Sequence, residues 1–178
     1  MLLILDLDET LVYSTTTLLD RAGDFRVDEY TVYQRPGLEH FLRFVARDFE
    51  TAIWSSSSSG YAQEIISHIF PNPSSLLFVW TRERCTRRFD PETRESYWVK
   101  DLKKVKRLGF KLEQTLIVDD SPEKLERNYG NHIRVDPYDG RQDDNELSAL
   151  TAYLSRIKKT PNVRILDKRD WKSQVGAA

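Results

Sequence analysis

The sequence predicts an α/β fold in which a mainly parallel central sheet carries helices on both faces. Short apolar runs of strand length occur at residues 2–5, 49–54 and 115–118, and segments with apolar residues at helical spacing separate them. Each run stops at polar or acidic residues, as expected where parallel strands bring side chains to the carboxyl edge of a sheet. The alternation of strands and helices is what indicates the class.

The first apolar run leads directly into Asp6 and Asp8, and the hydroxyl residue Thr10 follows two positions later. Two aspartates one residue apart are a weak signal on their own, because aspartate is common in this chain and both Asp and Thr also cap helices. The buried strand before them and the apolar residues after them favour a chemical role. We therefore expect this strand to present Asp6 and Asp8 at the sheet edge.

The first half of the chain then alternates between strand and helix patterns. Residues 25–33 predict a small hairpin or flap, and the Arg-Pro-Gly sequence at 35–37 predicts a turn. From Leu38 onward, apolar side chains at helical spacing lie on one face and predict a helix of about 11 residues that ends near residues 47–48. A helix at 62–69 follows the second strand, and residues 76–80 predict the next strand.

In the second half, a basic helix is predicted to begin at Lys100, with Leu102, Val105 and Leu108 facing inward and Gly109 at its end. The remaining predicted elements are a strand at 131–135, a polar loop at 136–145, a helix at 146–157 and an edge strand at 163–166.

A run of serines begins with Ser55 and Ser56 at the end of the second strand and leads into Gly60. Such a run is most often a flexible linker. Its position between a strand and a helix predicts instead a loop whose hydroxyl and backbone N–H groups can hold an anion.

An arginine-rich segment spans residues 81–97, with the turn sequence Asp-Pro-Glu-Thr near its middle. We interpret it as a second hairpin. It is either a solvated basic hairpin balanced by neighbouring acids or a recognition face for phosphate-rich ligands, which clustered arginines and aromatics favour. Arg84, Arg87 and Arg88 are the candidate substrate-binding residues on it.

Composition limits the function classes. With 178 residues and a formal net charge of −1, the chain has room for one domain, residues 1–178, and its bulk charge does not favour polyanion binding. The single cysteine, Cys85, excludes an internal disulfide and fits a reducing compartment. No apolar run approaches the roughly 20 residues that span a bilayer. We expect a monomer without membrane contact, intracellular and cytoplasmic, or nuclear in a eukaryote.

A second apolar strand also ends in acids, Asp119 and Asp120. Because the carboxyl ends of parallel strands meet at one edge, these acids are expected to converge with Asp6 and Asp8. Carboxylates packed that closely repel one another and take up protons unless a cation holds them. An oxygen-only ligand set favours Mg²⁺, whereas three histidines and one cysteine offer no spacing typical of zinc sites.

Four motifs resemble the haloacid dehalogenase superfamily of phosphotransferases: LILDLDETLV, the strand that ends at Ser55, Lys100, and IVDDSP. Further features resemble its Fcp/Scp branch, the phosphatases of the carboxy-terminal repeat of RNA polymerase II: RPG, FETAIWSSSSSGYA, the Arg84–Cys85 pair, YWVKDL, and IRVDP with DDNEL. The resemblance extends to NVRIL and implies a Rossmann-like fold with small β-hairpin inserts and no large cap domain. Ser55 replaces a common Thr and Asp120 a common Asn, which bears on substrate choice more than on chemistry.

The resemblance implies a role for each strand-end acid. Asp6 would be the nucleophile that forms an aspartyl-phosphate, and Asp8 would be the general acid and then the general base. Asp6, the backbone carbonyl of Asp8 and Asp119 would hold Mg²⁺, with Asp120 binding through water or supporting the ligands.

The resemblance also implies that Ser55 and Lys100 bind the phosphoryl oxygens, with Ser56 beside them in the loop. Taken alone, a lysine before a helix is usually a surface cation and a serine after a strand is usually a cap. Their order relative to the two acidic strand ends favours the phosphate-binding role. Thr10 would orient Asp8 or close the loop through a local hydrogen bond.

Three functions follow from these observations. The first is a Mg²⁺-dependent phosphomonoesterase that acts through an aspartyl-phosphate on phosphoserine or phosphothreonine in an extended peptide, since a site without a large cap cannot enclose a small metabolite. The second is a phosphatase for nucleic-acid ends or small phosphate esters that uses the arginine-rich hairpin. The third is a catalytically silent interaction domain, which the presence of Asp6, Asp8, Lys100 and Asp119 disfavours.

Overall fold

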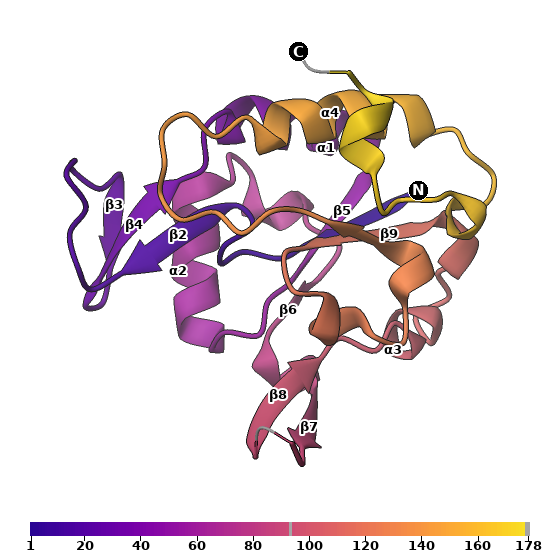
Figure 1. The fold of residues 1–178 in the computed structure, drawn as a ribbon, viewed down its shortest axis with the longest axis horizontal. Coiled ribbons are helices and arrows are strands. Elements are labelled where there is room, and N and C mark those ends of the chain that lie inside the picture. The colour runs from indigo at the N-terminus through magenta and orange to yellow at the C-terminus, as the bar shows by residue number, and fades with distance from the viewer. Residues whose placement is uncertain (93, 177–178) are drawn as a thin grey trace.

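The computed structural model describes residues 1–92 and 94–176. Its centre is a five-stranded parallel sheet with the strand order β10-β9-β1-β5-β6 (Figure 1). The predicted α/β class with a mainly parallel sheet is therefore confirmed. The strands are β1 (Leu2–Leu5), β5 (Glu50–Trp54), β6 (Val79–Trp80), β9 (Thr115–Asp119) and β10 (His132–Arg134).

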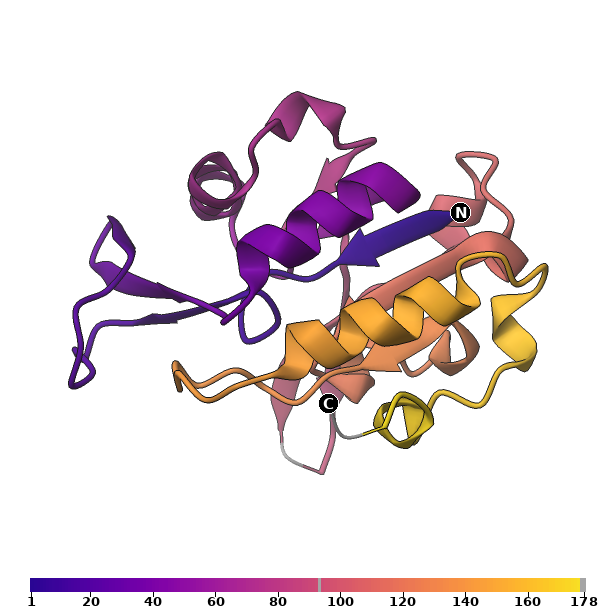
Figure 2. The same cartoon turned by 90° about the horizontal axis from the view of Figure 1, so that it is seen from above.

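Two apolar cores cover the two faces of this sheet. Along β1, Leu3 and Leu5 belong to one core, and Leu2 and Ile4 belong to the other, because successive strand side chains point to opposite faces. The first core is closed by three long helices, two of which lie side by side in Figure 2 (α1 and α4). These helices are α1 (Leu38–Asp48), α2 (Ser59–Ile69) and α4 (Glu146–Ile157).

The opposite core is closed by the short helix α3 (Lys103–Lys106) and contains Trp80 of β6 and Cys85, which precedes β7. Chain direction explains this division. The chain moves from β1 through β5 to β6 in one direction across the sheet, and then returns to β9 on the other side of β1. Right-handed crossovers therefore place α1 and α2 on one face and α3 on the other, as the prediction of helices on both faces requires.

Two small antiparallel sheets extend from the body, at the left and at the bottom of Figure 1. The predicted flap contributes a three-stranded sheet of order β2-β4-β3, one strand more than expected. The arginine-rich segment forms the predicted hairpin of β7 and β8. The strands are β2 (Val12–Thr15), β3 (Phe25–Val27), β4 (Tyr30–Gln34), β7 (Thr86–Asp90) and β8 (Glu95–Val99).

Several sequence predictions about local structure were wrong. The basic helix after Lys100 is only the single turn α3, and Leu108 is 55% exposed rather than inward, although Gly109 ends the segment with φ 95°. Basic residues three and four positions apart, such as Lys103 with Lys106 and Arg107, repel one another on a helix face and disfavour a longer helix. The predicted strand at 76–80 is reduced to β6.

The predicted edge strand at 163–166 is also wrong, since Val163–Ile165 is a 3-10 turn. The side chain of Asn162 accepts a hydrogen bond from the Arg164 N–H at 3.0 Å and closes this turn. This local hydrogen bond forms in place of strand pairing. The other 3-10 helices are Pro73–Ser75, Arg82–Arg84, Leu112–Gln114, Pro122–Leu125, Tyr129–Asn131 and Trp171–Gln174. Among the described residues, no helix combines the length and the apolar character that crossing a membrane requires.

Arg35, predicted only as part of a turn, is buried and connects distant segments of the chain. Its guanidinium donates to both carboxylate oxygens of Asp144, at 2.9 and 2.8 Å. It also donates to the backbone carbonyls of Thr10 at 3.1 Å and Asp136 at 2.8 Å. Because Thr10 belongs to the loop after β1, this arginine fixes that loop relative to the segment before α4.

Candidate active site

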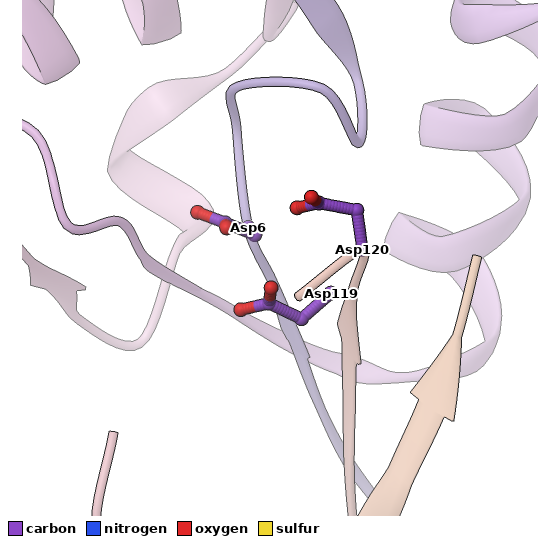
Figure 3. Close-up of side chains that lie close together, drawn as sticks. All are labelled: Asp6, Asp119 and Asp120. Carbon is purple, nitrogen blue, oxygen red and sulfur yellow. The ribbon is translucent and has the colours of Figure 1, made fainter. Parts of the chain in front are cut away.

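Three buried carboxylates gather where β1 and β9 end. Asp6 follows β1, Asp119 is the last residue of β9, and Asp120 comes next. The exposed fractions of these residues are 1%, 0% and 6%, and Figure 3 shows their carboxylates grouped at the ends of the two strands. The chain leaves β1 in one direction and enters β9 on its other side, so the cluster lies at the position where open α/β sheets bind ligands.

The loop after β1 is a tight turn. The carbonyl of Leu7 accepts hydrogen bonds from the N–H groups of Thr10, Leu11 and Val12 at 3.3, 2.8 and 3.1 Å. The Leu7 N–H donates to Asp6 Oδ1 at 2.9 Å, which orients the carboxylate. The Thr10 hydroxyl, for which we expected a local hydrogen bond, is buried without a hydrogen-bond partner among the described residues. Its backbone, rather than its side chain, closes the loop.

Lys100 lies between the two strand-end acids, as the sequence led us to expect. Its ammonium group is fully buried, 2.9 Å from Asp6 Oδ2 and 2.6 Å from Asp119 Oδ2. Burial alone would raise the pKa of Asp6, but Lys100 and Lys124 together lower it below its usual value. Burial, with the nearby charge of Asp6, raises the pKa of Asp119 to about 7.

Lys124 was not predicted to belong to the site. Its ammonium nitrogen lies 3.2 Å from Asp6 Oδ2, 3.7 Å from Asp119 Oδ1 and 3.8 Å from Asp120 Oδ1. Burial opposes the charge of this lysine, but the three carboxylates outweigh it and raise the pKa of Lys124. One feature of the sequence could have indicated Lys124: it follows Asp120 by four residues, about one helical turn.

Asp8 is held apart from this cluster. Its Oδ2 accepts a hydrogen bond from Ser57 Oγ at 2.6 Å, and its Oδ1 accepts one from Tyr61 Oη at 2.5 Å. Burial raises the pKa of Asp8, assisted by the charge of Asp6 and opposed by the two hydroxyl donors. Asp6 and Asp8 therefore have pKa values shifted in opposite directions. Sequence reasoning missed Ser57 and Tyr61, which follow the strand in the serine loop and in α2.

The serine loop lies beside the acids and is held by hydrogen bonds, as its position between a strand and a helix predicted, so it is not a free linker. Ser55 is buried, its backbone N–H donates to Trp80 O at 2.9 Å, and its Oγ accepts from the Ser57 N–H at 3.0 Å. The arginine that reaches this loop is Arg82, whose Nε donates to the Ser56 carbonyl at 2.8 Å. Arg82 belongs to the arginine-rich segment but was not among the candidates chosen there.

The three arginines that we selected lie elsewhere. Arg84 stacks over the ring of Trp80 at 5.4 Å and lines a cavity of about 590 Å³ with Lys104 and other residues. Arg87 is exposed on β7, and Arg88 is partly buried on the same strand. Within the described residues, none of these guanidinium groups forms an ion pair with the strand-end acids.

The acid cluster has the properties of a site for a hard cation. Asp6, Asp119 and Asp120 each offer one carboxylate oxygen, and these oxygens lie within 4.8 Å of one another. Asp120 Oδ1 is buried without a hydrogen-bond partner among the described residues, so it has capacity for a cation. A donor set of carboxylate oxygens without sulfur or imidazole fits Mg²⁺.

Comparisons with known proteins agree with this fold. A family model described as NLI interacting factor-like phosphatase matches residues 1–164. A probable C-terminal domain small phosphatase of Dictyostelium discoideum is 33% identical over 172 residues, which cover 92% of this chain and 53% of that protein. The mitochondrial import inner membrane translocase subunit TIM50 of Kluyveromyces lactis is 26% identical over 148 residues, 83% of this chain and 27% of that protein.

Among solved structures, fission yeast Fcp1, an RNA polymerase II CTD phosphatase bound to beryllium fluoride, aligns with a TM-score of 0.59 and 16% identity. The alignment covers 97% of this chain and 48% of that chain. This likeness shows that the two proteins share a fold. The family model covers most of the chain, so the chain belongs to the NLI interacting factor-like phosphatase family. It spans about half, or less, of the two curated relatives described above.

Proposed function

We propose that this chain is a Mg²⁺-dependent phosphomonoesterase that works through an aspartyl-phosphate on Asp6. The observation that carries the proposal is the contrast between two neighbouring carboxylates. Asp6 is kept charged by two lysines, whereas burial of Asp8 between hydroxyl donors raises its pKa. One group suited to attack and one suited to donate a proton are what a two-step transfer needs.

In the first step, an oxygen of Asp6 attacks the phosphorus, and the bond from phosphorus to the leaving oxygen breaks. Asp8 gives its proton to that leaving oxygen. In the second step, Asp8 takes a proton from water, the resulting hydroxide attacks the phosphorus of the aspartyl-phosphate, and Asp6 is released. The N–H of Leu7, bonded to Asp6 Oδ1 at 2.9 Å, limits rotation of the nucleophile.

The phosphoryl oxygens would be bound by Ser55, Ser56 and Lys100. Ser55 Oγ already accepts a hydrogen bond from the Ser57 N–H, so its own proton is available for a ligand. The buried ammonium group of Lys100 brings positive charge next to Asp6, where charge increases on the transferred group. Asp6, Asp119, Asp120 and the Asp8 carbonyl would hold Mg²⁺, which when bound offsets the charge between nucleophile and phosphate.

We propose phosphoserine or phosphothreonine in an extended protein segment as the substrate. The inserts found among the described residues are two small β-sheets, without a large cap to enclose a metabolite. The Dictyostelium relative named as a C-terminal domain small phosphatase supports a protein substrate. A panel that adds 5′- and 3′-phosphorylated oligonucleotides to phosphopeptides tests this choice against a nucleic-acid end.

A second candidate function is a binding module without catalysis, because part of TIM50, a translocase subunit, matches most of this chain. One assay distinguishes the phosphatase function from the binding module. With Mg²⁺ and a chromogenic aryl phosphate, the wild type should turn over, and Asp6→Asn should lose roughly 10⁴-fold or more of kcat, since the nucleophile is removed. An inactive wild type, or a fully active Asp6→Asn variant, would remove the enzymatic proposal.

A further inference from the structure

Lys124 pairs with Asp6, but the proposed mechanism gives it no part in binding the phosphoryl group or the metal. It lies in the short helix Pro122–Leu125, which follows the acids of β9. Its ammonium nitrogen is 3.2 Å from Asp6 Oδ2, 3.7 Å from Asp119 Oδ1 and 3.8 Å from Asp120 Oδ1. A single ammonium group thus contacts each of the three carboxylates that offer oxygens for a cation.

The charges of the cluster show what this contact does. With all three carboxylates ionised, Lys100 and Lys124 leave a formal charge of −3 + 2 = −1. Without the Lys124 ammonium the charge is −2, which one divalent cation neutralises. An ammonium group and a divalent ion that contact the same three carboxylates repel each other strongly. Occupation of the cluster by one therefore disfavours the other.

The two lysines differ in their freedom to leave. The Lys100 side chain has an exposed fraction of 0%, and its ammonium is enclosed between Asp6 and Asp119. The Lys124 side chain is 19% exposed. Its backbone is fixed, because its carbonyl accepts from the Lys100 N–H at 2.7 Å and its N–H donates to Ser121 O at 3.2 Å. The flexible side chain can rotate toward solvent while the helix turn stays in place.

We propose that Lys124 is a built-in placeholder for the divalent cation. Its ammonium group neutralises Asp6, Asp119 and Asp120 in the metal-free protein and leaves the cluster when Mg²⁺ binds. The inference rests on the metal site of the proposed function, but it concerns metal binding rather than turnover. As a consequence, the apparent Mg²⁺ affinity equals the intrinsic affinity multiplied by the fraction of molecules in which Lys124 has left the cluster.

Calorimetric titration with Mg²⁺ tests this competition directly. Lys124→Met should bind Mg²⁺ about tenfold or more tightly than the wild type, because the competing ammonium is gone. Lys103→Met is the matched control, since it removes the same charge from an exposed residue of α3. It should stay within about twofold of the wild type, because solvent and salt screen it. Equal affinity in the two variants, or weaker binding by Lys124→Met, would overturn the proposal.

Labelling of the wild type gives a second readout that does not depend on a folded variant. An amine-reactive ester followed by peptide mass spectrometry measures how accessible each lysine is. Saturating Mg²⁺ should increase labelling of Lys124 severalfold while labelling of Lys103 stays constant. Unchanged or reduced labelling of Lys124 at saturating Mg²⁺ would contradict the placeholder role.

Turnover separates this inference from the function on which it rests. If Lys124 competes with Mg²⁺ in both tests but the wild type fails to hydrolyse an aryl phosphate, the phosphatase proposal fails and the placeholder role stands. If the wild type hydrolyses the ester while Lys124→Met and Lys103→Met bind Mg²⁺ equally, the placeholder role fails and the phosphatase proposal stands.

Discussion

At the scale of single residues, two aspartates that are two positions apart acquire different chemistry from their surroundings. Asp6 faces Lys100 and Lys124, which keep it charged although it is buried. Asp8 faces Ser57 and Tyr61, which are neutral donors and offset burial only in part. The environments, rather than the residue type, define the nucleophile and the acid.

Tyr61→Phe should move the pH dependence of turnover. The Tyr61 hydroxyl stabilises the charged form of Asp8, so its loss should raise the pKa of Asp8 further. Because a general acid must carry its proton, the alkaline limb of the kcat profile should shift to higher pH. Tyr30→Phe is the control, since Tyr30 contacts the Tyr61 ring edge-on at 6.0 Å without bonding to Asp8. An unshifted or downward-shifted limb in Tyr61→Phe argues against Asp8 as the acid.

At the scale of elements, the loop after β1 is held by the buried pair of Arg35 and Asp144, which joins it to the segment before α4. The side chains of these residues are 0% and 8% exposed. Burial would raise the pKa of Asp144, but its hydrogen bonds with Arg35 lower it below the ordinary value of 3.8. The pair therefore contributes to stability and also fixes the position of the loop that carries Asp6 and Asp8.

Asp144→Asn should lower the free energy of unfolding at neutral pH by about 3 kcal/mol, because the buried guanidinium of Arg35 loses its counter-charge. In the wild type, the unfolded chain binds the Asp144 proton first as pH falls below 3.8. The stabilisation is therefore complete above that pH and is lost as pH falls through the lowered folded pKa. In urea titrations, the difference in free energy of unfolding between the wild type and Asp144→Asn should therefore shrink as the pH falls. Asp139→Asn, which removes an exposed pair with Arg141, should change stability by less than about 1 kcal/mol.

The β7–β8 hairpin is a second element whose role can be measured. If it recognises substrate, Arg87→Ala with Arg88→Ala should lower kcat/KM for an acidic phosphopeptide about tenfold and leave aryl phosphate turnover unchanged, because rim charges act on the extended ligand alone. Arg134→Ala with Arg164→Ala, two exposed arginines outside the hairpin, provides the comparison. If kcat/KM for the peptide is equal in the two double variants, the hairpin is solvated surface without a role in substrate recognition.

At the scale of the whole molecule, the parallel sheet converts distant sequence positions into one site, and this much was predictable. Apolar runs ending in acids predicted that Asp6 and Asp119 would meet, and the order of the motifs added Lys100. Helical spacing predicted the length of α1 and the bounds of α4. Lys124, Tyr61 and Arg35 were missed. Their contacts depend on how turns and helices pack, which no periodicity in the sequence records.

Errors of element length have the same origin. The segment after Lys100 has helical spacing but forms only α3, since its packing surface is limited to Leu102 and Val105. Residues 163–166 have strand composition, yet a side-chain bond from Asn162 closes a turn there. Short apolar patterns specify burial more reliably than they specify conformation.

Mg²⁺ should stabilise the whole molecule, because it binds a folded cluster that the unfolded chain lacks. At 100 times its dissociation constant, the added free energy of unfolding is about 2.7 kcal/mol. Thermal unfolding with and without EDTA measures this gain. Asp120→Asn should reduce it, since one carboxylate of the cluster is lost. A wild-type melting temperature that does not respond to Mg²⁺ contradicts the metal site.

Acid quenching during turnover tests whether Asp6 carries the phosphoryl group. The wild type is mixed with Mg²⁺ and aryl phosphate, quenched in acid during turnover and mapped by peptide mass spectrometry. We expect one phosphoryl group on Asp6, absent from Asp6→Asn and absent when the substrate is omitted. A phosphoryl group on another residue, or turnover by Asp6→Asn at the wild-type rate, would contradict it.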